Sequence, residues 1–182
     1  MFRPDVPPPP VHPSTDMVLL LRHAMVDGGD RTTLILKGHI AVEQTLYTAA
    51  SNRLKKPEAI LKPHTKFSTK LDLMKALYGE EVDQRLYTLC GKLNKLRNDL
   101  AHKLEPQGFD TMIEDFLVLD APSMPGTKRG DLRIMDHMKV DEILLYKMSA
   151  IISDICEVVF AEEIENYEGS IAAWIAALPS TA

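Results

Sequence analysis

Apolar residues recur at helical spacing along most of the chain, and the clearest case lies between Glu80 and Glu105. Within this segment the stripe consists of Val82, Leu86, Leu89, Leu93, Leu96 and Leu100. The alternating four- and three-residue steps, at about 100° per residue, place these side chains on one narrow face of a helix. The pattern therefore predicts a helix over 80–105 whose leucine stripe is buried, and Pro106 is expected to stop it.

The same periodicity predicts helices in the rest of the chain, at about 16–26, 30–54, 68–78, 109–119 and 139–165, with one helical turn at 58–61. Asp30 or Thr32 is expected to begin the second of these, because short polar side chains cap helix N-termini. A loop is predicted at 121–130, which contains two prolines and two glycines. No segment alternates in the way a strand does, so the expected fold is all-α, a helical bundle of about five to seven helices.

Two segments at the ends of the chain differ from this pattern. Residues 1–15 contain prolines at positions 4, 7, 8, 9, 10 and 13, which predicts an extended arm. The apolar segment 171–178 is too short to cross a bilayer and is expected to dock on the bundle or on a partner. Residues 16–182 fit a single helical-bundle domain, long enough to bury a core.

Composition narrows the classes of function. The chain is 45% apolar and 26% charged, as is usual for a soluble globular protein, and its formal charge is −5. A protein that binds nucleic acid through its overall field is usually basic, so any such contact here has to be local. The lysines and arginine of the 80–105 helix could supply it, although a solvated helix face explains the same residues: Lys92, Lys95, Arg97 and Lys103.

The cysteines and the start of the chain bear on its compartment. Cys90 and Cys156 lie within apolar helical patterns, as buried thiols do in a reducing environment. The first residues have no apolar signal core and no membrane span is expected, so the cytoplasm is the expected compartment. No Cys/His spacing indicates a metal site and no glycine-rich loop indicates a phosphate-binding cofactor site, so neither metal nor cofactor is expected.

A second row of residues runs beside the leucine stripe: Tyr87, Gly91, Asn94, Asn98 and then Ala101 with His102. Small and amide-bearing residues on one face allow close approach and hydrogen bonding. This face is therefore expected to meet another helix or a second copy of the chain. Arg97 borders the stripe, and a guanidinium, an amide and an imidazole are expected to converge at this end of the helix.

Two polar residues interrupt the apolar arc of the 30–54 helix. His39 and Glu43 are one turn apart, and leaving either one buried without a partner would cost about 1–3 kcal/mol. One interpretation makes Glu43 the counter-ion that orients Arg97 from the neighbouring helix. The other has His39 and Glu43 satisfying each other or a helix end.

The segment Leu96-Arg97-Asn98-Asp99-Leu100-Ala101-His102 resembles the signature of the HEPN superfamily of small helical proteins. That signature is an arginine, a polar residue directly after it, and a histidine after a gap of four to six residues, on a late helix of an up-and-down bundle. The run from Phe67 to Gly79 is similar to the mannitol-operon repressor branch of the group. The resemblance covers roughly residues 34–105 and rests on the similarity of these sequence patterns alone.

The resemblance implies a metal-independent endoribonuclease of toxin or defence type. Attack of a ribose 2′-hydroxyl on the adjacent phosphate needs a base, an acid and positive charge for the phosphorane oxygens. His102 would supply one proton carrier, and a homodimer would supply the second together with two copies of Arg97. Asn98 would orient the phosphate or the arginine, and the dimer contact is expected at Gly91, Asn94 and Asn98. The expected partners are a second copy, an RNA substrate and an antitoxin.

The alternative interpretation is architectural. A histidine in the last turn of a helix is favoured by the helix dipole, and an arginine beside an apolar stripe often packs only its stem. On this interpretation the protein is a non-catalytic transcriptional co-regulator of the mannitol-repressor type that acts through contacts with a regulatory protein.

Overall fold

The computed structural model describes residues 30–102 and 108–161 and, beyond them, positions 164, 165, 168, 170 and 172. The helices of this part are α2 (Arg31–Arg53), α3 (Pro57–Ile60), α4 (Phe67–Tyr78), α5 (Gln84–His102), α6 (Phe109–Leu117), α7 (Arg129–Ile134) and α8 (His137–Val159), with a 3-10 turn η1 (Gly79–Glu81) between α4 and α5. Its only β-type pairing is an isolated bridge between Ala121 and Met124. The predicted all-α class is confirmed.

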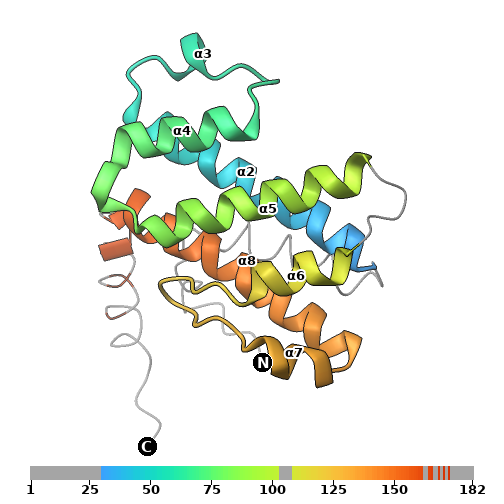
Figure 1. The fold of residues 1–182 in the computed structure, drawn as a ribbon. Helices are drawn as coiled ribbons and strands as arrows, with labels where there is room; N and C mark the ends of the chain where they lie inside the picture. Colours follow the sequence, from blue (N-terminus) through green and yellow to red (C-terminus); the bar gives the residue numbers. More distant parts are fainter. Residues whose placement is uncertain are drawn as a thin grey trace, which may run out of the picture.

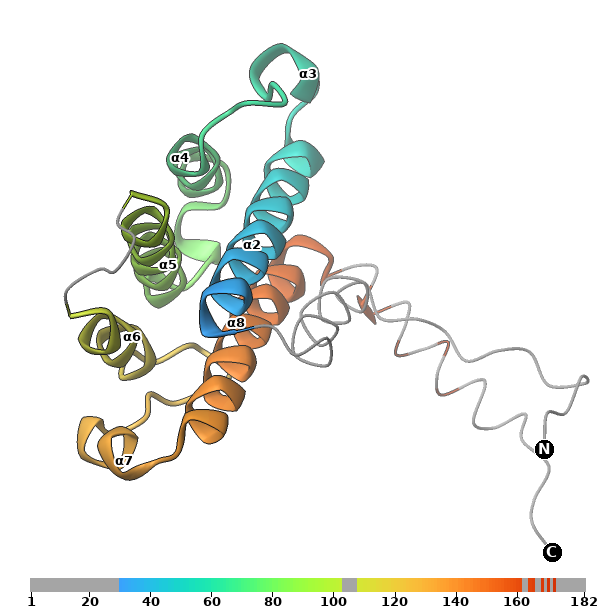
Figure 2. The same cartoon turned by 90° about the vertical axis from the view of Figure 1, so that its right-hand side faces the viewer.

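The helices form two layers. In Figure 1, α4, α5 and α6 lie in front and alternate in direction, with α2 and α8 behind them. Figure 2 shows the three front helices nearly end-on in a row, while α2 and α8 run side by side in the same direction along the other layer. The core lies between the layers, and α2 packs against α4, α5 and α8, which makes it the central helix that its broad apolar arc predicts.

Most predicted boundaries are confirmed to within a few residues. Asp30 caps α2, and its carboxylate accepts a hydrogen bond of 2.7 Å from the Thr33 amide. The motif helix, however, begins at Gln84 and not at Glu80, because Gly79 turns the chain at a positive φ of 51°. Asp83 then accepts from the Arg85 amide at 2.8 Å and starts α5.

Two expectations about the C-terminal half are wrong. The loop predicted at 121–130 ends early, because α7 begins at Arg129, and this short helix buries the side chain of Leu132. The last long helix, expected at about 139–165, is His137–Val159. Asp136 caps it two residues earlier, where its carboxylate accepts from the Lys139 amide at 2.9 Å. Phe160, at φ −115° and ψ 32°, ends it, although residues 161, 164 and 165 are again helical. The arm 1–15, the helix predicted at 16–26, Pro106 and nearly all of 171–178 lie outside the described residues.

The leucine stripe is buried as predicted, from Val82 to Leu96, although Leu100 at its end is only partly buried. Helix α2 packs closely against α8 at Gly38. A Cβ atom built there would lie 1.9 Å from the sulfur of Met148 on α8, and Met148 is fully buried. Gly91 on α5 is the opposite case, since it is exposed and a Cβ built there meets nothing within 4 Å.

This contrast gives a matched pair of variants. Gly38→Ala overpacks the interface of α2 with α8, at a cost of about 1–3 kcal/mol, which exceeds the roughly 0.5–1 kcal/mol that alanine gains over glycine within a helix. Gly91→Ala should keep that gain and raise the free energy of unfolding. Urea unfolding of both variants checks the prediction, and equal stabilisation by the two alanines would contradict it.

Candidate functional site

A cavity of about 330 Å³ lies where α2, the start of α4 and α5 meet the connecting segment 61–66. Its lining residues are His39, Glu43, Pro63, His64, Thr65, Lys66, Phe67, Ser68, Asn94, Arg97 and Asn98. The structure thus brings together five of the six candidate site residues, all except His102: His39, Glu43, Asn94, Arg97 and Asn98. Helical spacing explains this, because His39 and Glu43 are one turn apart on α2, as Asn94 and Asn98 are on α5.

His39 forms the inner wall of the cavity and is 4% exposed. Its Nε2 lies 3.2 Å from the Asn94 side-chain oxygen, and its ring stacks on Phe67 with centroids 4.5 Å apart. An amide oxygen only accepts, so the Nε2 atom carries the proton. Burial lowers the pKa of His39, and the charges of Arg97 and Lys70 also lower it, while the bond to Asn94 and the charge of Glu43 oppose the shift. The imidazole is therefore neutral near pH 7.

Glu43 is paired differently from the first interpretation. Its carboxylate accepts from the Lys70 ammonium at 2.9 Å, and its other oxygen lies 3.9 Å from His39 Nδ1. The predicted ion pair with Arg97 is thus replaced by one with Lys70, and Arg97 instead donates to the Asn98 side-chain oxygen at 3.1 Å. Lys70 was missed by the sequence reasoning, although it follows Phe67 by three residues and so lies on the inward face of α4.

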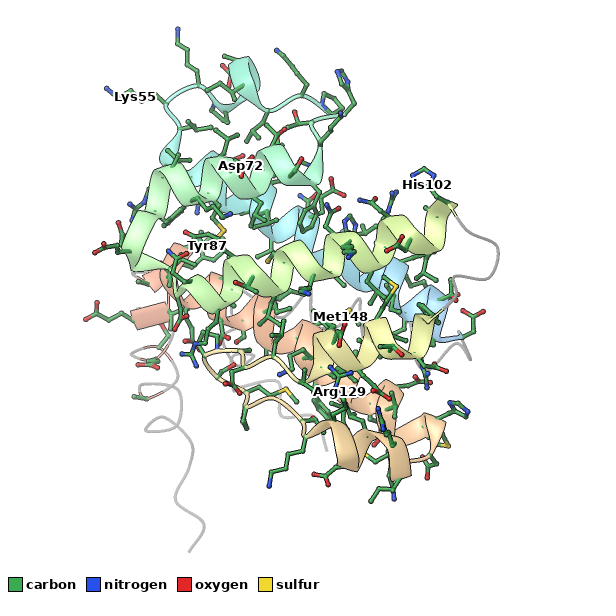
Figure 3. All side chains as sticks on the ribbon, in the orientation of Figure 1. Lys55, Asp72, Tyr87, His102, Arg129 and Met148 are labelled. Carbon is green, nitrogen blue, oxygen red and sulfur yellow. The ribbon has the colours of Figure 1, made fainter. Side chains whose placement is uncertain are left out.

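His102 does not line the cavity. It is the last described residue of α5, it is exposed, and Figure 3 shows it at the opposite end of that helix from Tyr87. Five residues of helix separate it from Arg97, which corresponds to a rise of about 7.5 Å and a rotation of about 140°. Within one copy of the chain, the guanidinium and the amide therefore come together at the cavity, while the imidazole stands apart.

The second row of α5 is also divided. Tyr87 is buried and its hydroxyl donates to the Gly79 carbonyl at 3.3 Å, and Asn94 meets His39 of α2. Gly91, Ala101 and His102 are exposed. Helices of the same chain therefore cover only part of the row, and the expected contact with a second copy stays a prediction.

The described residues contain no group of three or more His, Cys, Asp or Glu side chains arranged to hold a metal ion. No helix among them has the length and apolar character needed to traverse a bilayer. Both cysteines are buried thiols, and burial raises the pKa of Cys90 to about 12 and of Cys156 to about 11. Neither thiol is a nucleophile near neutral pH.

Comparison of the chain with protein-family models, with curated proteins and with solved structures finds no match. The HEPN resemblance of residues 67–79 and 96–102 therefore stays a prediction.

The neutral state of buried His39 predicts a pH dependence of stability. Unfolded His39 has its ordinary pKa of 6.5 and the folded value is lower, so between the two values the unfolded chain binds a proton that the folded chain does not. The free energy of unfolding should fall as the pH drops through 6.5 toward the folded pKa. The His39→Gln variant keeps a donor for Asn94 but has no ring to titrate, so the part of this fall that is due to His39 should be absent.

Urea unfolding of both proteins from about pH 8 to about pH 5 measures the effect as a difference, in which the other titrating groups cancel. The stability of the wild type relative to the variant should decrease below 6.5, the ordinary pKa of the ring. Curves that stay parallel over the whole range would show that His39 titrates equally in both states.

Proposed function

We propose that the protein is an endoribonuclease of the HEPN type that acts as a homodimer and without a metal ion. The observation that carries the proposal is that Arg97 and Asn98 line an open cavity while His102 is exposed on the same helix. A cation and an amide thus line the cavity, and an imidazole is accessible from solvent five residues further along the same helix. The resemblance of residues 96–102 to the HEPN signature supplies the reaction class.

The proposed reaction is an internal transfer of the phosphodiester. The ribose 2′-oxygen loses its proton to a base and bonds to the adjacent phosphorus, and the bond from phosphorus to the 5′-oxygen breaks as an acid protonates that oxygen. The products are a 2′,3′-cyclic phosphate and a free 5′-hydroxyl. Arg97 would neutralise the charge that develops on the phosphorane oxygens. Asn98 would act as a positioning residue, since it accepts from the Arg97 guanidinium at 3.1 Å.

A second copy completes this scheme because each chain provides one exposed His102 and the reaction needs two proton carriers. The exposed small residues Gly91 and Ala101 would allow two α5 helices to approach closely. In a twofold dimer, one imidazole would act as the base and the other as the acid. An antitoxin is the expected further partner of such a dimer.

The proposal predicts the effect of single substitutions. His102→Ala should lower the cleavage rate of single-stranded RNA by roughly 10²–10⁴-fold, the usual contribution of a proton-transfer group. Arg97→Ala should cause a loss of roughly 10²–10³-fold, as for other groups that stabilise a developing oxyanion. Cleavage is measured in the presence of a chelator, with detection of the cyclic phosphate end.

Lys55→Ala is the matched control, because it removes one positive charge from an exposed position away from the cavity. It should cleave like the wild type, and sedimentation should show a dimer for all these proteins. A wild-type protein that cleaves no RNA, or variants that cleave as fast as the wild type, would refute the nuclease.

The second candidate is a non-catalytic transcriptional co-regulator. Two observations favour it: the net charge of −5 and the position of His102 in the last turn of α5, where the helix dipole favours a basic side chain. On this view His102→Ala changes stability or affinity for a regulatory protein. An inactive wild type that binds such a protein would select this candidate.

A further inference from the structure

We infer that the cavity between α2, α4 and α5 is a binding site for the phosphate group of a ligand, complete within one copy of the chain. The site goes beyond the proposed nuclease, because it needs neither His102 nor a second copy. Arg97 is the principal ligand-binding group, and Lys66 and His64 complete the rim.

The charge balance of the cavity favours an anion. Its lining contains the cations Arg97 and Lys66 and a single carboxylate, Glu43. That carboxylate is neutralised by Lys70 at 2.9 Å, whose side chain is only 9% exposed. Because the only acid of the lining already has its counter-ion, Arg97 and Lys66 leave the lining with a net positive charge, and so with a field that favours an anion, although the chain as a whole carries −5.

The start of α4 adds to this field. The residue at its N-cap is Lys66, which makes no side-chain capping bond, and the first turn contains no acidic residue. Helices usually place an acceptor or a carboxylate there, because the N-terminal amides are donors at the positive end of the helix dipole. Because Lys66 supplies no negative charge at this helix end, an anionic ligand can provide the charge that stabilises the N-terminal amides of α4. Lys66, Phe67 and Ser68 all line the cavity, so this helix end lies at the site.

Stacking and a hydrogen bond hold the buried wall of the site in place. His39 is 4% exposed, stacks on Phe67 and fixes the Asn94 amide through a bond of 3.2 Å between Nε2 and the amide oxygen. With its oxygen turned to His39, the Asn94 side chain presents its amino group as a donor. Asn98 similarly holds the Arg97 guanidinium. Donors fixed before binding lower the entropy cost of capturing a ligand.

The size of the cavity limits the ligand. Its volume of about 330 Å³ lies at the lower end of the range of roughly 300–1,000 Å³ for small-molecule sites. A phosphate with one sugar-sized group attached suits this volume. The ligand is thus either a free phosphomonoester or one nucleotide unit of an RNA strand.

Isothermal titration of the full-length protein with inorganic phosphate, adenosine monophosphate and a short single-stranded RNA tests the site. Arg97→Ala should weaken binding of all three about tenfold or more, because a charged hydrogen bond contributes roughly 1.5–3 kcal/mol. Lys66→Ala, at an exposed position that leaves the core intact, should weaken it severalfold. Lys55→Ala, at an exposed position away from the cavity, should bind like the wild type. Tighter binding of the monophosphate than of RNA would identify a free phosphomonoester as the ligand, and the reverse would identify the strand.

The test of phosphate binding can succeed or fail independently of the proposed RNA cleavage. Phosphate binding that depends on Arg97 and Lys66, in a protein that cleaves no RNA, would uphold the site and refute the enzyme. If the protein cleaves RNA and His102→Ala loses phosphate binding to the same extent as Arg97→Ala, the anion lies at the end of α5 and not in the cavity. That result would overturn the site. No binding of any of the three probes, or binding unchanged in both Arg97→Ala and Lys66→Ala, would also overturn it.

Discussion

The contact of Gly38 with Met148 is the constraint on which the geometry of the cavity depends. Without a side chain at position 38, α2 approaches α8 closely enough for the methionine sulfur to occupy the place of a Cβ atom. His39 is the next residue, about 100° further round the helix, and so it is turned away from α8 toward Phe67 and Asn94. The position of a polar residue in the cavity is thus set by a close apolar contact on the adjoining face of α2.

The polar groups of the cavity are arranged so that no charged side chain is buried without a counter-ion. His39 is neutral because burial lowers its pKa, and Glu43 shares its charge with Lys70. An ion pair of this kind contributes little net stability, because the attraction is largely offset by the loss of hydration. The ion pair instead fixes the orientation of Glu43, because Lys70 of α4 holds its carboxylate. The guanidinium of Arg97 therefore contacts Asn98 and not Glu43.

Local pattern was enough to predict the all-α class, the leucine stripe of α5 and the cap at Asp30, because each depends on neighbours within one or two turns. It failed where the partner lies far along the chain. Lys147 interrupts the apolar face of α8, yet it is fully buried, since its ammonium donates to the carbonyls of Leu119, Met124 and Pro125. Lys70 is the same case within the candidate site. The convergence of Arg97 and Asn98 was predictable from spacing, whereas the separation of His102 depends on where the cavity lies.

That separation constrains any chemistry at the cavity. A phosphate held by Arg97 has two imidazoles of the same chain beside it, His39 and His64. His39 is neutral, and its Nε2 proton is engaged with Asn94, which makes it a fixed wall and not a proton carrier. His64 is exposed at the rim. Since His102 lies about 140° round α5 from Arg97, cleavage of a phosphodiester in this cavity needs His64 or the His102 of a second copy. A cavity that only binds needs neither, so binding is the simpler consequence of the geometry and catalysis the one that requires assembly.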